Sequence, residues 1–326
     1  MSAGSNAPSL PGRQRARPWW HWQHWLKRLL KVCFLALIAY LLFRQARSIE
    51  WDKVAAAIYQ RSVPSLLLAA CLAAASHLLY ASFDLLGKRL TGHGLAARTV
   101  MGITFVCYAF TLNLGSLIGG VAMRYRLYSR FGLQSTVITR IAATSMLTNW
   151  SGYLLLAGLA FWWRPLPLPA DWQLDSGGLR LLGMAMVAMT LAYLLLCAFA
   201  KQRDWTVRGH GITLPPWKLA LAQVLVSCTN WLVISGLMYL LLQRKIDFPT
   251  VVAVLLAAAI AGVITHVPAG LGVLEAVFIT LLSQQLGRNE LLAALILYRF
   301  LYYLAPLVLA CMVYFATEAE AKRRGL

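Results

Sequence analysis

The stretch Phe248–Val267 reads FPTVVAVLLAAAIAGVITHV, and Pro268-Ala269-Gly270-Leu271-Gly272-Val273-Leu274-Glu275 follows it directly. An apolar run of about 20 residues is long enough to cross the hydrocarbon core of a bilayer as a helix. Proline lacks an amide donor and glycine favours non-helical backbone, so we expect the helix to break at Pro268, Gly270 and Gly272. Such backbone is tolerated at membrane depth only where protein buries it or water reaches it. This stretch therefore predicts a membrane protein with a broken helix.

The composition of the whole chain agrees with that class. Of its 326 residues, 60% are hydrophobic and 13% are charged, whereas soluble domains carry about 25% charged residues. Basic loops beside anionic lipid account for the net charge of +19, and little soluble surface is left to bind nucleic acid. The six cysteines all lie in apolar stretches, without a C-x-x-C pair. We therefore predict no disulfide, no metal site and no cofactor.

Three regions follow from the distribution of apolar residues. Residues 1–18 form a disordered basic tail, 19–316 a helical transmembrane domain, and 317–326 a short basic cytoplasmic tail. The hydrophobic segments within the domain are Leu26–Phe43, Val63–Leu86, Val100–Met123, Ile141–Trp163, Leu179–Ala200, Trp217–Leu242, Phe248–Val267, Leu271–Leu286 and Leu291–Ala316. The fold class is thus an all-α polytopic membrane protein.

The distribution of Lys and Arg indicates how many segments cross. If Val100–Met123 enters the membrane and returns to the same side, the cytoplasmic side carries about twice as many basic residues as the far side. If this segment crosses fully, that asymmetry largely vanishes. We therefore expect about eight transmembrane helices, two broken or re-entrant segments and both termini in the cytoplasm.

The second break lies in the first half of the chain. Val100–Met123 contains Gly119 and Gly120, and the chain resumes into Arg124. Paired interruptions in the two halves of a chain are a sequence pointer to a transporter's binding site, often with an inverted repeat. The alternative at either break is an ordinary turn at the membrane surface.

Few charged residues lie within the apolar segments. Of the eleven acidic residues, only Asp84 and Glu275 do so, and an ionised group in hydrocarbon costs at least about 2.5–3.5 kcal/mol. Arg140 and Arg299 are the cations at membrane level. We expect carboxylate–guanidinium pairs, although the sequence does not say which groups pair. The predicted buried polar residues are Asp84, His77, Arg140 and Asn149.

Several of these side chains suit a phosphate-bearing ligand. Arg124 and Arg126 follow the first break, and arginine forks match phosphate oxygens. Arg299 and Tyr303 lie one helical turn apart in the last segment, and His266 adjoins the second break. The alternatives are a basic cytoplasmic loop for the first pair, a buried ion pair for Arg299 and a structural histidine for His266.

No enzyme signature is present. The sequence contains no H-E-x-x-H, G-x-S-x-G or P-loop motif, and its histidines are scattered. A hydrolase or transferase within the membrane would need more convergent acid, base or metal groups.

The second break also carries a family resemblance. Pro268 to Glu275 resembles the P-x-G-x-G-x-x-E motif of the membrane region of lysylphosphatidylglycerol synthase/flippase proteins, and Gly119-Gly120…Arg124 and Tyr298-Arg299…Tyr303…Pro306 resemble its other hallmarks. Ala269 stands where many relatives have glycine. The likeness extends from about Leu29 to Phe315 and is strongest to stand-alone bacterial inner-membrane proteins, also classed as a family of unknown function.

The resemblance implies a function in lipid movement. In two-domain relatives this region moves an aminoacylated phospholipid between leaflets, and a soluble domain, which we expect to be absent here, makes that lipid. The leading hypothesis is a phospholipid translocase of the bacterial inner membrane, with Arg124, Arg126 and Arg299 holding the headgroup and Glu275 as counter-charge or gate. The alternative is a scaffold that docks a lipid-synthesis enzyme through Lys201, Arg203 and Arg208. A weaker third hypothesis is an enzyme acting on a lipid phosphate.

Overall fold

The computed structural model describes residues 61–163, 176–201, 204–207, 210–265 and 270–323, with a few isolated positions outside these ranges. These residues belong to the second of two compact units, Glu50–Leu326. The predicted tail and the first predicted segment, Leu26–Phe43, lie outside the described residues. The division at residue 18 therefore stays a prediction.

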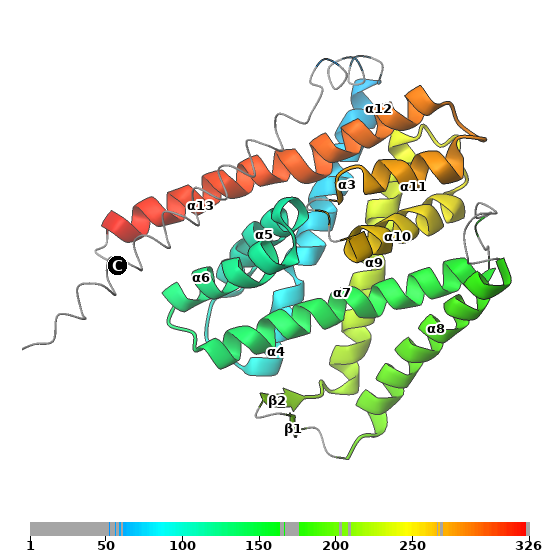
Figure 1. Cartoon of the computed structure of the whole chain (residues 1–326). Helices are drawn as coiled ribbons and strands as arrows, with labels where there is room; N and C mark the ends of the chain where they lie inside the picture. Colours follow the sequence, from blue (N-terminus) through cyan, green and yellow to red (C-terminus); the bar gives the residue numbers. More distant parts are fainter. Residues whose placement is uncertain are drawn as a thin grey trace, which may run out of the picture. The chain divides into compact units, whose positions relative to one another are not determined.

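Helices make up nearly all of the described chain (Figure 1). In order they are α3 (Val63–Ala81), α4 (Phe83–Thr91), α5 (Ala97–Leu114), the π-helix η1 (Ser116–Ala122), α6 (Met123–Arg130), α7 (Ser135–Trp163), α8 (Ser176–Phe199), α9 (Trp217–Leu241), α10 (Phe248–Thr265), α11 (Val273–Leu282), α12 (Arg288–Tyr298), the π-helix η3 (Arg299–Leu304) and α13 (Ala305–Arg323). The sequence did not predict the short antiparallel hairpin of β1 (Asp204–Val207) and β2 (His210–Thr213) between α8 and α9.

The all-helical membrane class is confirmed. Within the described residues, six helices are long and apolar enough to cross a bilayer: Val63–Thr91, Ala97–Leu114, Ser176–Phe199, Trp217–Leu241, Phe248–Thr265 and Arg288–Ala316. The 29-residue α7 is longer than most of these but carries more Ser, Thr and Asn. The expected number of eight crossings is not confirmed.

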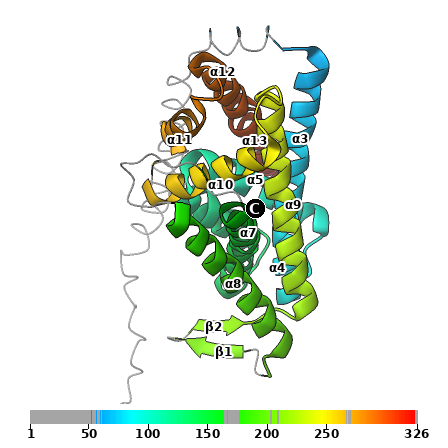
Figure 2. The same cartoon turned by 90° about the vertical axis from the view of Figure 1, so that its right-hand side faces the viewer.

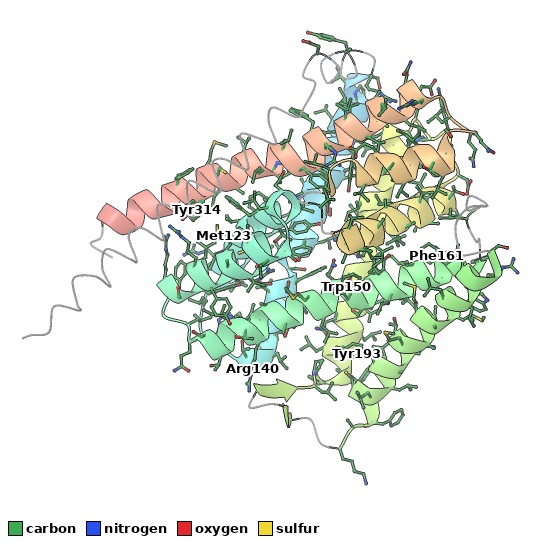
Figure 3. All side chains as sticks on the ribbon, viewed as in Figure 1. Met123, Arg140, Trp150, Phe161, Tyr193 and Tyr314 are labelled. Atoms are coloured by element: carbon green, nitrogen blue, oxygen red, sulfur yellow. The ribbon has the colours of Figure 1, made fainter. Side chains whose placement is uncertain are left out.

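The prediction that Arg140 is buried is wrong, because helix α7 begins earlier than expected. We predicted a segment that begins at Ile141, with Arg140 buried at membrane level. Helix α7 instead begins at Ser135, and Arg140 lies exposed in its second turn (Figure 3). A long arginine side chain near a helix end can extend its charge away from hydrocarbon, which removes the need for a buried partner.

Small residues bring the central helices close together. Figures 1 and 2 show α7 packed against α8 and α9. A Cβ added at Gly152 of α7 would lie 2.4 Å from the Cβ of Ser227 in α9, and one at Gly158 would lie 2.8 Å from the carbonyl oxygen of Gly183 in α8. Such close approach supplies the dispersion contacts that hold membrane helices together, since lipid provides no hydrophobic drive between them.

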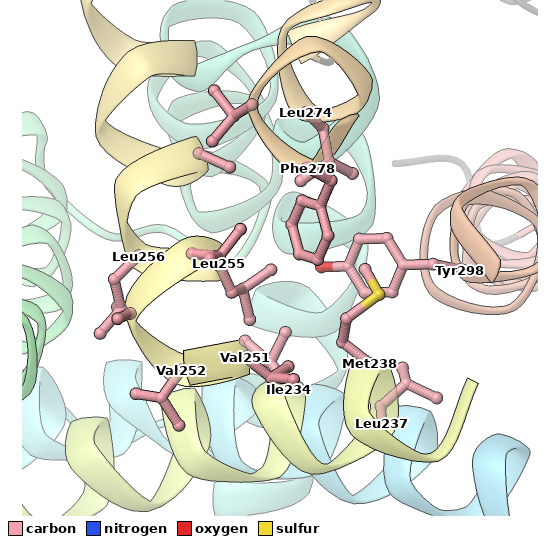
Figure 4. Packing of buried hydrophobic residues seen from close by; sticks show 14 of the residues in the cluster. Ile234, Leu237, Met238, Val251, Val252, Leu255, Leu256, Leu274, Phe278 and Tyr298 are labelled. Carbon is pink, nitrogen blue, oxygen red and sulfur yellow. The ribbon is translucent and has the colours of Figure 1, made fainter. Parts of the chain in front are cut away.

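A large apolar core fills the space between α9, α10, α11 and α12. Figure 4 shows Phe278 of α11 and Met238 of α9 beside the ring of Tyr298, the last residue of α12. All three side chains are buried. This packing fixes α12 immediately before η3, the helix that carries Arg299.

Candidate functional site

The first buried ion pair joins Asp84 of α4 to Arg124 of α6. Arg124 Nε and Nη2 donate to the two carboxylate oxygens of Asp84 at 3.0 Å each, a bidentate geometry. Arg124 Nη1 donates to the Gly120 carbonyl at 2.8 Å, and Nη2 also donates to Ser145 Oγ of α7 at 3.0 Å. Tyr128 donates its hydroxyl to Asp84 Oδ2 at 3.0 Å. The pair thus ties α4, α6 and α7 together.

This pair is enclosed by protein. The side chain of Arg124 is 2% exposed and that of Asp84 is 0% exposed. Each of the three guanidinium nitrogens already donates to a protein acceptor. A headgroup could reach Arg124 only after these bonds break. The predicted contact between Arg124 and a lipid headgroup is therefore not favoured in this conformation, and it stays a prediction. Arg126, half-buried nearby, lies 5.5 Å from the centroid of the Tyr314 ring.

The second intramembrane ion pair joins Glu275 of α11 to Arg299 of η3. Arg299 Nε donates to Glu275 Oε1, and Nη2 donates to Glu275 Oε2 at 2.8 Å. Nη2 also donates to the carbonyl of Gly270 at 3.0 Å. The guanidinium carbon lies 5.6 Å from the Tyr303 ring centroid, within cation–π range. The sequence placed Arg299 and Tyr303 on one helix face, and in the structure the Tyr303 ring and the Glu275 carboxylate both contact the Arg299 guanidinium.

The two ion pairs differ in their access to solvent or lipid. The side chains of Arg299 and Glu275 are 9% and 23% exposed, against 2% and 0% for Arg124 and Asp84. Glu275 is the third residue of α11, so the free amides at the start of that helix favour its negative charge. The Arg299–Glu275 pair is therefore the one that a ligand can reach with less rearrangement.

Both breaks are turns made by glycine. The first turn lies at Gly115, with φ +86° and ψ 166°, a conformation open essentially to glycine alone. The predicted hinges Gly119 and Gly120 lie instead in the helical turn that follows. There a Cβ at Gly119 would lie 2.1 Å from the backbone nitrogen of Thr111, so η1 folds back directly onto α5.

At the second turn, Gly270 and Gly272 have φ values of +55° and +79°. Gly272 is the residue that precedes α11. These positive values agree with the predicted break in the helix. The predicted hinge Pro268 and the predicted site residue His266 lie outside the described residues.

The two hairpin tips converge on η3. Asn113, two residues before the first turn, donates from Nδ2 to the carbonyl of Tyr303 at 3.2 Å. Arg299, on the same π-helix, donates to Gly270 at the second turn. In Figure 1 the α5–α6 hairpin and the α10–α11 hairpin point toward one another from opposite sides of the bundle. A single helical turn of the last span therefore holds both broken segments.

The π-helical form of η3 has a local cause. Pro306 follows it closely, and its ring would clash with the carbonyl of the residue four positions earlier, Tyr302, in a regular α-helix. The wider turn of a π-helix relieves that clash, and such turns occur often at functional sites. The sequence did not predict the π-helical turn before Pro306.

Beside η3 lies a chain of buried hydroxyl groups that the sequence did not identify. The hydroxyls of Tyr108 in α5 and Tyr302 in η3 lie 2.7 Å apart, and Tyr302 lies 2.7 Å from Ser76 Oγ of α3. Ser76 donates to Asn230 Oδ1 of α9 at 2.7 Å. Position supplies a signal that could have found Tyr302, because it is the central residue of the span Arg288–Ala316.

The remaining predicted buried residues differ in burial. His77 is buried next to Ser76, at the centre of the span Val63–Thr91, and Asp84 is buried in its ion pair. Asn149 is half-buried, and its backbone carbonyl accepts a bond from Ser227 at 3.0 Å. Arg140, described above, is the exception.

Comparison with known proteins agrees with this architecture. The chain is 45% identical over 298 residues to the Inner membrane protein YbhN of Escherichia coli, an alignment that covers 91% of this chain and 94% of that protein. It is 31% identical over 252 residues to the Uncharacterized protein slr0712 of Synechocystis, which covers 76% of this chain and 78% of that protein.

A more distant similarity reaches a larger protein. The chain is 24% identical over 313 residues to the Phosphatidylglycerol lysyltransferase of Staphylococcus aureus, which covers 91% of this chain but 35% of that protein. The family model described as the Lysylphosphatidylglycerol synthase TM region matches residues 28–310. This chain therefore belongs to the family of the lysylphosphatidylglycerol synthase transmembrane region.

Proposed function

We propose that this protein moves a phospholipid with an anionic or phosphate-bearing headgroup between the leaflets of the bacterial inner membrane. The observation that carries the proposal is the Arg299–Glu275 ion pair, partly exposed at the turn where both hairpin tips meet. Arg299 lies three residues from the centre of its span, which is about 4.5 Å along a helix. A charged pair at that depth is costly unless it has a partner or a purpose.

The order of the helices supports access from both leaflets. Three helices, α7, α8 and α9, separate the α5–α6 hairpin from the α10–α11 hairpin. If each of the three crosses the bilayer, an odd number of crossings places the hairpins on opposite faces. One hairpin tip then closes the site from each side. Interrupted helices arranged this way around a midplane site are typical of alternating-access transporters.

A phosphate headgroup would exchange places with Glu275. Arg299 offers Nε and Nη2 to the carboxylate, and the same edge of a guanidinium matches two phosphate oxygens. When a phosphate takes that edge, Glu275 loses its partner and the α10–α11 tip loses one tie to η3. Binding of the headgroup and opening of the hairpin are thereby linked.

The positions of basic residues favour cytoplasmic termini. Lys88 and Arg89 lie at the end of α4, Arg98 at the start of α5, and Arg126 and Arg130 on α6. The positive-inside rule places the α4–α5 and α6–α7 turns in the cytoplasm. If the predicted segment Leu26–Phe43 and the span Val63–Thr91 each cross the bilayer once, the N-terminus lies on the same side. We propose no catalytic step.

Reconstitution tests this function. Purified protein is placed in liposomes with fluorescent phosphatidylglycerol or a zwitterionic control lipid, and label in the outer leaflet is quenched chemically. We expect quenching of the anionic probe well beyond half, and its loss in Arg299→Gln and Glu275→Gln. Lys245→Gln is the matched control, because it breaks an ion pair with Glu290 at the exposed surface. Quenching that stops at half in the unmodified protein would contradict the proposal.

A further inference from the structure

His77 of α3 is a polar residue at the centre of an apolar span. His77 and Tyr302 are the central residues of the spans Val63–Thr91 and Arg288–Ala316, and Asn230 lies one residue from the centre of Trp217–Leu241. If these helices cross the bilayer, all three side chains lie at its midplane. Histidine is the side chain that ordinarily gains and loses a proton between about pH 5 and about pH 8.

One of the two ring nitrogens of His77 has a hydrogen-bonding partner. His77 Nδ1 lies 2.9 Å from the Ala73 carbonyl oxygen, and a carbonyl only accepts, so Nδ1 carries the proton. The remaining nitrogen, Nε2, therefore has a lone pair. It is buried in a side chain that is 3% exposed, and it has no hydrogen-bonding partner among the described residues. Asn230 Nδ2, on the neighbouring helix, likewise lacks a partner in the part of the chain that the structure describes.

The surroundings of His77 are aromatic and neutral. The ring centroids of Tyr302, Tyr108 and Phe105 lie 4.9, 5.1 and 5.9 Å from that of His77. The titratable groups that face it are thus the two tyrosines, Tyr108 from α5 and Tyr302 from η3, while α9 presents the neutral Asn230. Aromatic faces stabilise a cation, although they do not replace a counter-charge.

Among the described residues, the two carboxylates within the apolar segments, Asp84 and Glu275, are both paired in this conformation and do not supply that counter-charge. The next carboxylate along α3 and α4 is Asp84, which is bonded to Arg124. Glu275 is bonded to Arg299, one turn of η3 before Tyr302 and Tyr303. A proton on Nε2 would therefore be an unbalanced charge in the closed arrangement. Displacement of Glu275 from Arg299 by a lipid phosphate changes this, because it leaves one negative charge unbalanced at the same depth.

We propose that His77 is a proton-binding site that couples the movement of the anionic lipid to a proton gradient. The proton adds to the lone pair of Nε2 and leaves it again, with no covalent bond broken. Tyr302 links the two events, since its ring contacts His77 and its π-helix holds both hairpin tips. A proton that binds the open arrangement more tightly than the closed one shifts the protein toward opening as pH falls. This proposal rests on the proposed function.

The first test uses the same liposomes with a pH gradient across the membrane. One proton per lipid predicts that the ratio of probe in the two leaflets changes by up to about tenfold per pH unit. We expect the unmodified protein to show this shift and His77→Asn to lose it, because asparagine keeps an Nδ2 donor for Ala73 but does not titrate. His93→Asn is the matched control: this histidine lies in the loop after α4, and we expect its variant to respond like the unmodified protein. A gradient response that persists in His77→Asn, or is absent from the unmodified protein while lipid moves, overturns the proposal.

The second test does not depend on lipid movement. Amide hydrogen exchange of the peptide around Asn113 to Gly119 reports release of the α5 tip from η3. After correction for the intrinsic effect of pH, we expect exchange to rise several-fold as the pH falls from about pH 8 to about pH 4 in the unmodified protein, because burial without a counter-charge opposes protonation of the imidazole. Exchange should stay constant in His77→Asn. The same rise in both proteins overturns the proton site. A protein that moves no lipid but shows the expected exchange refutes the proposed function alone.

Discussion

Substitution of Asp84 by asparagine tests whether the enclosed ion pair is structural. The change keeps the size of the side chain and removes its charge, so Arg124, 2% exposed, remains charged without its counter-ion. Removal of one partner from a buried pair costs about 3–5 kcal/mol, since the remaining charge is left in a low-dielectric interior. For a chain of 326 residues the expected fall in melting temperature is about 4–7 °C.

The assay is thermal unfolding of the purified protein in detergent, followed by loss of the monodisperse peak. Glu290→Gln is the matched control: it breaks the Lys245–Glu290 pair, whose side chains are 44% and 50% exposed, and such pairs contribute about 0–1 kcal/mol. The double variant Asp84→Leu with Arg124→Met removes both buried charges and is expected to recover part of the lost stability. A melting temperature of Asp84→Asn equal to that of the control variant would refute the structural role of the pair.

Three further substitutions test the turns and the hydroxyl chain. Gly119→Ala places a Cβ 2.1 Å from the Thr111 nitrogen, and we expect overpacking to cost about 1–3 kcal/mol in the same melting assay. Gly272→Ala imposes a φ of +79° on alanine and should cost about 1–2 kcal/mol. Gly262→Ala lies inside α10 and has no atom within 4 Å of the added Cβ, so it should be stabilising by up to about 1 kcal/mol, because alanine favours a helix over glycine. Equal melting temperatures of these two variants would contradict the backbone argument. Tyr302→Phe removes the hydroxyl between Tyr108 and Ser76, and the hydroxyls left without this partner should cost about 1–3 kcal/mol of stability. We expect a lower melting temperature. The control Tyr125→Phe removes an exposed hydroxyl and should leave the melting temperature unchanged.

The class of the fold follows from the sequence because a bilayer imposes strict requirements. A span needs about 20 apolar residues, and a break in one needs Gly or Pro. Most observed helices accordingly begin within a few residues of their predicted segments, and both breaks are present. The first turn was misplaced to Gly119 and Gly120, because Gly115, Gly119 and Gly120 all allow a turn and only the packing of η1 against α5 selects Gly115.

The partners of the charged residues did not follow from the sequence. Asp84 and Arg124 are far apart along the chain, as are Glu275 and Arg299, and four intramembrane charges allow more than one pairing. Arg140 was also predicted to lie at membrane level, because the apolar segment was expected to begin directly after it, at Ile141. The hydroxyl chain was missed for a different reason: tyrosine and serine in an apolar stretch are common, and only their meeting at 2.7 Å distinguishes Ser76 and Tyr302.

Exchange of the two charges of the Arg299–Glu275 pair tests whether Arg299 binds the headgroup, with lipid movement as the assay. Arg299→Glu combined with Glu275→Arg keeps one positive and one negative charge at the turn, but it places the guanidinium on α11 instead of η3. We expect this variant to remain folded, with a melting temperature near that of the unmodified chain. We also expect that it no longer moves the anionic probe beyond the half-quenched level. Movement of that probe at the unmodified rate would show that the pair serves only to hold the helices together, and would contradict the assignment of Arg299 as the headgroup site.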